Sequence, residues 1–198
     1  CKNLKMLGID ILFTCVPDKE IQKVYPSTTL PKLKIVNILT GCTPESFLKY
    51  KKTPICNRAI DVGYRSRKNP YWLGKLGYEK FFIAQQFKLM SHKYNLNLDL
   101  STNENDRIYG QDWIDFVGSC KTMIGVESGS SIFDFSGELE NKVNNIIKKD
   151  PHISFEKVYN QCLKPFEGNV YLNQISPRCF EAAALKTPMV LFEGKYSG

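Results

Sequence analysis

The amino-acid sequence predicts an α/β fold in which a parallel sheet carries helices on both faces. Short apolar stretches with the alternation typical of strands recur along the chain, and segments of helical periodicity lie between them. Strands that alternate with helices are typical of parallel sheets, because each crossover places a helix on a face of the sheet. With 198 residues, 42% of them hydrophobic, the chain is long enough to bury such a core.

The first part of the chain holds two short strand candidates and several prolines. Residues 9–14 and 35–39 are apolar and alternate as strands do. Residues 17–34, between these strands, carry three prolines among polar residues, so we expect an irregular connection there. Residues 41–57 add two further prolines and a lysine cluster before the next regular element.

From residue 58 onward the predicted strands and helices alternate regularly. The strands are expected at 59–64, 96–100, 121–127, 170–172 and 188–193, and the helices at 79–94, 111–119, 138–149, 154–164 and 177–186. The first of these helices places Ile83, Phe87, Met90 and Tyr94 on one face. Parallel sheets bind ligands beyond the carboxyl ends of their strands, so functional residues are expected there.

The sharpest candidate site is the start of the helix predicted at 177–186. Ser176 is a favourable N-cap and Pro177 a favourable first helical residue. The free backbone amides of the first turn favour an anion, Arg178 adds a positive charge, and Glu181 follows on the same face. This pattern suits a nucleoside diphosphate, with Glu181 accepting hydrogen bonds from the ribose. A capped helix with a surface Arg–Glu pair would have the same pattern.

A basic turn follows the first strand of this regular part. Gly63 lets the backbone approach a ligand closely, and Arg65 and Arg67 follow it. Lys80, at the head of the next helix, is placed to reach the same phosphates. The turn contains neither a G-x-G-x-x-G fingerprint nor a phosphate loop, and basic turns also occur on plain surfaces.

The strand predicted at 121–127 opens into a loop of small residues. Glu127, Ser128, Gly129 and Ser130 offer a carboxylate, hydroxyls and amides to phosphate or sugar oxygens. A flexible turn rich in Gly and Ser explains the same residues equally well.

The net charge of +7 is concentrated in one block. Residues 46–95 hold eleven Lys or Arg against two acidic residues, a local charge of +9. Such a block attracts the phosphates of a small ligand, nucleic acid or an anionic membrane, although a solvated face has the same composition. The block also contains four aromatic residues, Tyr64, Tyr71, Trp72 and Tyr78. An alternative hypothesis is therefore a nucleic-acid-binding module that combines phosphate contacts with base stacking. The helix start at Ser176 has no role in that alternative, which therefore ranks second.

Three segments of the chain resemble bacterial glycosyltransferases of the GT-B type, which consist of two Rossmann domains. The segments are DVGYRSRKNPYWLGKLGYEK at 61–80, GVESGSSIFDF at 125–135 and SPRCFEAAALKTPMVLFEGKYSG at 176–198. They are most similar to members with a glycosyltransferase group 1-like C-terminal half. The resemblance implies that residues 58–198 form the nucleotide-sugar-binding domain, which has a Rossmann-like sheet. It also implies that this domain is incomplete at its C-terminal end. It implies that residues 1–57 are the tail of the N-terminal, acceptor-side domain and the interdomain connection.

The resemblance also implies roles for single residues. Glu181 matches the family glutamate that holds the donor ribose, and Arg65 and Lys80 resemble the Arg and Lys that neutralise the donor diphosphate, at a wider spacing. Many retaining relatives carry a second glutamate eight positions before the ribose one. This chain has Asn173 there, so the catalytic residues and the stereochemical outcome stay open.

The expected function is that of a hexosyltransferase-like enzyme, which moves a sugar from a nucleotide-diphosphate donor to a glycan or lipid-linked acceptor in cell-surface polysaccharide synthesis. We expect the 198 residues alone to be inactive. No run of about 18 apolar residues occurs, so we expect no transmembrane helix. The seven cysteines are scattered without a tight spacing, which favours reduced thiols and a cytoplasmic protein. This location is compatible with peripheral contact between the basic block and the inner face of an anionic membrane. With two histidines and no Cys-x-x-Cys pair, we expect no metal and no cofactor besides the donor substrate.

Overall fold

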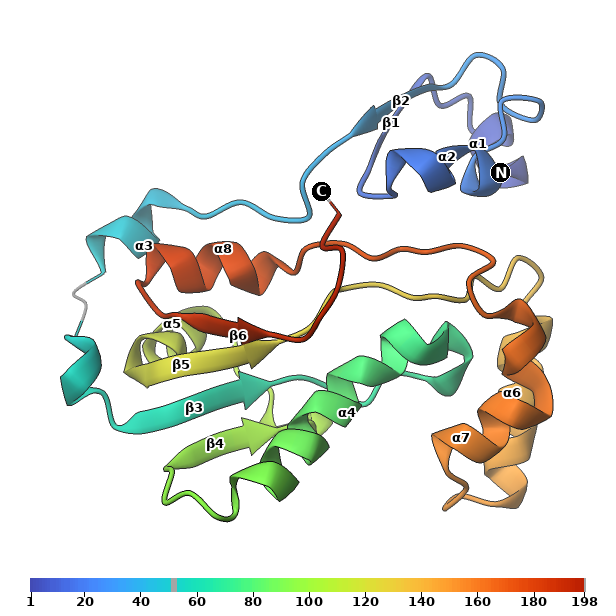
Figure 1. Ribbon diagram of the computed structural model, residues 1–198. Helices are drawn as coiled ribbons and strands as arrows, with labels where there is room; N and C mark the ends of the chain where they lie inside the picture. Colours follow the sequence, from blue (N-terminus) through green and yellow to red (C-terminus); the bar gives the residue numbers. More distant parts are fainter. Residues whose placement is uncertain (51–52, 198) are drawn as a thin grey trace.

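Two parallel sheets flanked by helices make up the computed structural model, which describes residues 1–50 and 53–197 (Figure 1). The smaller sheet pairs β1 (Ile11–Thr14) with β2 (Lys34–Asn37). The larger sheet has the strand order β4-β3-β5-β6, with strands Ile60–Arg65 (β3), Leu98–Ser101 (β4), Cys120–Gly125 (β5) and Met189–Leu191 (β6). All its pairings are parallel. The predicted α/β fold with a Rossmann-like parallel sheet is confirmed.

One face of the larger sheet is covered by the long helix α4 (Gly74–Ser91). Because side chains alternate along a strand, Val62 and Tyr64 of β3 point to the same face. They pack there against Ile83 and Ala84 of α4. The tyrosine side chain is fully buried, so this contact is part of the core.

The opposite face is covered by α3 (Glu45–Lys49), α5 (Gly110–Ser119) and α8 (Pro177–Ala184). Met123 of β5 is buried on this face between Val117 of α5 and Ala182 of α8. These three side chains are completely enclosed, and they fix α8 against the sheet.

A third layer of helices packs beside the start of α4. It consists of α6 (Glu138–Lys149), α7 (Phe155–Val158) and a π-helical continuation, η4 (Tyr159–Leu163). These segments share a core of apolar side chains with Tyr71. The predicted helices at 138–149 and 154–164 are confirmed, and Ser154 Oγ accepts a hydrogen bond from the Lys157 amide at 3.3 Å, as expected of an N-cap.

The remaining helical segments are short. They are α1 (Lys2–Met6), α2 (Asp18–Val24), η1 (Ile55–Asn57), η2 (Tyr71–Leu73), η3 (Glu104–Asp106) and η5 (Lys164–Phe166). No helix within residues 1–50 and 53–197 has an apolar stretch long enough to cross a membrane.

The structure corrects three expectations about the elements. The connection expected at 17–34 contains α2, since Pro17 is the N-cap residue of that helix and Pro26 follows its end. Helix α4 begins five residues earlier than predicted, because its first turns contain two glycines and resemble a loop. The strand expected at 170–172 is not formed, and only Gln174 makes isolated bridges, to Ser128 and Ser197.

The smaller sheet packs against the segment that leads into α8. Val16 and Val24 are buried against Val170. Thr40 Oγ1 donates a hydrogen bond to the Ile175 carbonyl at 2.5 Å. The N-terminal part of the chain therefore contacts the residues directly before the start of α8.

The buried side chain of Arg58 joins β3, β5 and the end of α8. Its guanidinium donates to the Cys120 carbonyl at 2.9 Å, to Thr187 Oγ1 at 2.6 Å and to the Leu185 carbonyl at 3.2 Å. Its Nε donates to the Thr53 carbonyl at 3.0 Å. All four acceptors are neutral oxygens, so carbonyl and hydroxyl dipoles stabilise the buried charge.

Replacing Arg58 with methionine should destabilise the fold strongly. The Arg58→Met variant leaves several buried acceptors without donors, which should lower the free energy of unfolding by about 3 kcal/mol. Urea denaturation followed by circular dichroism measures this change. The matched control is Lys49→Met, which removes an exposed pair with Glu45 at 3.2 Å and should cost about 0.5 kcal/mol or less. Equal destabilisation by the two substitutions would contradict a structural role for Arg58.

Candidate functional site

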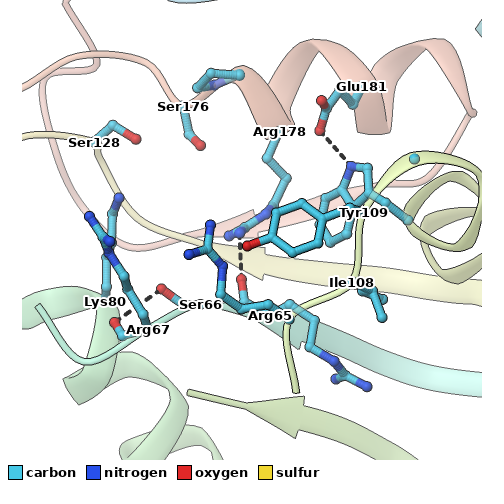
Figure 2. A pocket seen from close by; sticks show the side chains of 14 residues that line it. Arg65, Ser66, Arg67, Lys80, Ile108, Tyr109, Ser128, Ser176, Arg178 and Glu181 are labelled. Carbon is cyan, nitrogen blue, oxygen red and sulfur yellow. Dashed lines mark hydrogen bonds between the residues drawn. The ribbon is translucent and has the colours of Figure 1, made fainter. Parts of the chain in front are cut away.

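A cavity of about 580 Å³ opens at the carboxyl edge of the larger sheet (Figure 2). β3 ends in it at Arg65, the segment after β5 reaches it at Ser128, and the start of α8 forms the opposite wall. Five of its fourteen lining residues are cations, namely Arg65, Arg67, Lys80, Arg107 and Arg178. Among the described residues that line it, Glu181 alone is acidic. The cavity is therefore suited to an anion.

The start of α8 faces this cavity. Ser176 is the N-cap residue and Pro177 the first helical residue, as predicted. In the described part of the chain, the Ser176 hydroxyl caps no amide of the helix, and it lies on the cavity wall. The first turn of a helix carries unpaired amides and the positive end of the helix dipole, both of which favour an anion.

Arg178 is held in place by aromatic rings and not by a carboxylate. Its guanidinium lies 5.0 Å from the Tyr64 ring centroid and 5.4 Å from that of Trp113. One nitrogen donates to the Arg65 carbonyl, and the buried Nε has no hydrogen-bond partner among the described residues. The side chain is thus oriented while its positive charge stays available to a ligand.

Glu181 is aligned by Trp113. The indole Nε1 donates to Glu181 Oε2 at 2.8 Å (Figure 2). This bond fixes the carboxylate beside Arg178 and satisfies one of its two oxygens. Trp113 contacts both predicted residues of α8, since its ring also lies against the guanidinium.

The positive charge of Lys80 is disfavoured by its position in the cavity. Burial, and then the neighbouring charges of Arg178 and Arg67, lower the pKa of its amine to about 8. Its Nζ has no carboxylate partner within the described residues, so nothing offsets this repulsion. An anionic ligand would supply the missing negative charge.

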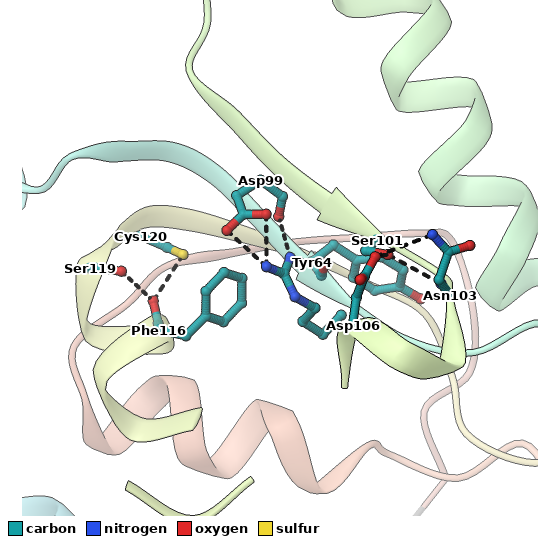
Figure 3. Close-up of polar contacts among 9 residues, drawn as sticks. Tyr64, Asp99, Ser101, Asn103, Asp106, Phe116, Ser119 and Cys120 are labelled. Atoms are coloured by element: carbon teal, nitrogen blue, oxygen red, sulfur yellow. Dashed lines mark hydrogen bonds and ion pairs between the residues drawn. The ribbon is translucent and has the colours of Figure 1, made fainter. Parts of the chain in front are cut away.

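Arg65 lines the cavity, but its guanidinium contacts residues of the neighbouring strand β4 and of helix α5. It forms an ion pair with Asp99 at 2.8 Å and lies 4.4 Å from the centroid of the Phe116 ring (Figure 3). The charge of Arg65 is therefore largely balanced, in contrast to that of Arg178. What Arg65 contributes directly is its carbonyl, which orients the Arg178 side chain.

Two predicted glycines lie outside the cavity, at contacts within the protein. A Cβ on Gly63 would lie 2.3 Å from Cys120 Sγ, so this residue permits close packing between β3 and β5. Gly129 has a φ of +126°, and a Cβ there would lie 1.5 Å from the Leu172 oxygen. Ser130 is buried beside it and accepts a hydrogen bond from the Leu172 amide at 2.8 Å. Of the small-residue loop, only Ser128 lines the cavity.

Glu127 is buried against the last segment of the chain. Its Oε1 accepts a hydrogen bond from the Lys195 amide at 2.7 Å, and also accepts from the Tyr196 amide. Asn173 Nδ2 lies 3.4 Å from the same oxygen. This carboxylate, expected to contact a ligand, instead anchors residues 195–196.

The loop after β4 was not predicted as part of the site. Residues 107–110 and Trp113 line the cavity and include the exposed ring of Tyr109. The signal was available, since this loop follows the carboxyl end of a predicted strand, as the loops at Arg65 and Ser128 do. Trp113 resembles a core residue in the sequence because Phe116 and Val117 follow it three and four positions on, on the same face of a predicted helix.

Removing Arg178 should raise the pKa of Lys80. In an Arg178→Met variant we expect an NMR titration of the Lys80 side chain to give a pKa between about 8 and the ordinary 10.5. The recovery is partial, because burial is the larger cause. Arg107→Met, a change in the same cavity that removes neither of the two neighbouring charges, should leave the pKa at about 8. An unchanged pKa in Arg178→Met would refute the interaction.

Comparisons with known proteins give no relative of this chain: no protein-family model, no curated protein and no solved structure matches it.

Proposed function

We propose that the cavity binds the diphosphate of a nucleotide-sugar donor, and that the chain is the donor-binding part of a glycosyltransferase. The observation that carries this proposal is a cavity at the carboxyl edge of a parallel sheet that holds five cations and one carboxylate. Its volume of about 580 Å³ suits a small-molecule ligand. The sequence resemblance at 58–198 adds the class of donor.

The diphosphate, the ribose and the base of the donor each have a counterpart in the cavity. The amides that open α8, together with Arg178 and Lys80, supply positive charge for the phosphates. Glu181, fixed by Trp113, keeps one carboxylate oxygen to accept from a ribose hydroxyl. The exposed Tyr109 ring on the cavity wall offers an aromatic face to a base.

The same charges explain how such a site would promote transfer. The diphosphate gains negative charge as it leaves the sugar, and fixed cations that face it stabilise this state more than the ground state. The acceptor in this proposal is a glycan or a lipid-linked sugar. Residues 1–57 belong to the acceptor-side domain and its connection, and 58–198 to the donor-side domain of a cytoplasmic hexosyltransferase-like enzyme, peripheral to the inner face of the membrane.

The burial of the aromatic residues disfavours the nucleic-acid alternative. Tyr64 and Tyr71 are buried, so these two rings are not displayed on the surface for bases. Arg58, counted in the basic block, is buried as well. Lys51 and Lys52 of that block lie outside the described residues.

Binding of nucleoside diphosphates tests the proposal directly. We expect calorimetric titration with UDP, GDP, CDP and ADP to show saturable binding of at least one. Arg178→Gln should weaken both that nucleotide and inorganic pyrophosphate about tenfold or more, since a charge-assisted hydrogen bond is lost. Glu181→Gln should weaken the nucleotide but not pyrophosphate, because it removes only the ribose contact.

The control for these variants is Lys88→Gln, an exposed change near the end of α4 and outside the cavity lining. It should bind as the original chain does. Absence of saturable binding for all four nucleotides in a folded sample would refute the proposal.

Trp113→Phe separates alignment of Glu181 from orientation of Arg178. Phenylalanine keeps an aromatic face for the guanidinium but cannot donate to the carboxylate. We expect the nucleotide to bind about three- to tenfold more weakly while pyrophosphate binding stays unchanged. Calorimetry with both ligands gives the comparison. An equal loss for the two ligands would indicate that the substitution disturbs Arg178 or the fold instead.

A further inference from the structure

A second depression, of about 420 Å³, lies between the first half of α4, helix α7 with its continuation η4, and the end of β6. Most of its wall consists of aromatic side chains, and we call it the aromatic groove; the rings are Tyr78, Phe82, Phe155, Tyr159 and Phe192. None of its lining residues lines the cavity described above.

The rings of the groove contact one another in a continuous series. Tyr78 and Phe155 stack with centroids 4.2 Å apart and planes 6° apart, and Tyr159 follows at 5.6 Å from Phe155. On the other side of Tyr78, Phe82 lies 6.3 Å away and meets Phe192 edge to face. These contacts hold the rings in place without a ligand, so the aromatic surface is formed in advance.

Two carboxylates lie among these rings. Glu79 of α4 and Glu156 of α7 both line the groove, and neither forms an ion pair within the described residues. Burial, and then the nearby Glu127 and Glu167, raise the pKa of Glu79 to about 7. Of the described residues that line the groove, two are acidic and one, Lys75, is basic, in a chain with a net charge of +7.

The protein already places one ammonium group on these rings. Lys75 Nζ, which also lines the groove, lies 4.9 Å from the centroid of the Tyr159 ring. An aromatic face attracts a cation through its quadrupole, and the attraction grows when several rings and a carboxylate surround the charge. The Lys75 side chain therefore stands where the charged group of a ligand would bind.

We propose that the aromatic groove binds an organic ammonium group, of the kind carried by choline or a methylated amine. Contiguous ring faces with carboxylates at their rim are the arrangement that recognises such cations. An anion is disfavoured by Glu79 and Glu156, and a neutral apolar group would cover both carboxylates without compensation. The proposal does not depend on the function of the cation-lined cavity.

A pair of isosteric ligands tests the need for a positive charge. Choline and 3,3-dimethylbutan-1-ol have nearly the same shape, but only choline is charged. In ligand titrations followed by NMR of the protein, we expect choline to bind at least about tenfold more tightly than the alcohol. Equal affinities, or no shift of groove resonances with choline, would overturn the proposal.

Two substitutions should change choline affinity in opposite directions. Glu156→Gln removes a carboxylate from an exposed position and should weaken choline about three- to fivefold. Lys75→Met removes the competing ammonium and should tighten choline by a similar factor. Glu140→Gln, an exposed change on α6 outside the groove, is the matched control and should have no effect. If both groove variants bind as the control does, the site is not in the groove.

Affinity for choline should also rise between pH 6 and pH 8. Glu79 loses its proton in this range and gains a negative charge, because its pKa is about 7. The charged groups around it are Glu127 and Glu167, which repel its charge, and Lys75 and Glu156, which line the same groove. Glu79→Gln should abolish the rise while leaving nucleotide binding in the other cavity intact. A pH dependence that persists in Glu79→Gln would assign it to another group and contradict this part of the proposal.

Discussion

The geometry of the cation-lined cavity depends on a buried charge at the opposite edge of the sheet. Arg58 bonds to β5 through the Cys120 carbonyl and to the end of α8 through the Leu185 carbonyl. Because α8 is only eight residues long, holding one end of it sets the direction of the whole helix. The start of the helix then lies at the carboxyl edge of the sheet, where a ligand is expected.

Gathering positive charge at one edge costs stability, and neighbouring groups reduce that cost in different ways. Arg65 is neutralised by Asp99, whereas Arg178 contacts ring faces and a carbonyl. Lys80 has no carboxylate partner among the described residues, and burial, followed by the charges of Arg178 and Arg67, lowers the pKa of its amine. Binding sites of this sort have their charges in position before a ligand binds, which lowers the stability of the protein without ligand. In the proposed site, the charges of Arg178 and Lys80 are the ones left for a ligand, and the Arg65–Asp99 pair supports the cavity wall.

Most of the fold and half of the site follow from local patterns. The Ser-Pro start of α8 and the N-cap at Ser154 were predictable because each pattern acts within one turn of helix. Glu127 and Gly129 were assigned to a ligand, but the structure shows contacts to residues 195–196 and 172. A carboxylate or a glycine has the same appearance in the sequence whether its partner is a ligand or a distant segment of the chain. Trp113 was missed for the same reason, since its bond to α8 crosses 68 positions.

The position of Gly129 limits how the loop after β5 is able to evolve. Its neighbour Ser128 lies on the cavity wall and also bridges Gln174, while Gly129 abuts the Leu172 oxygen. Any side chain at 129 would push the segment around residue 172 away and strain that bridge. A substitution at 128 therefore changes what the loop presents to the cavity, whereas a substitution at the next position displaces a neighbouring segment of the chain.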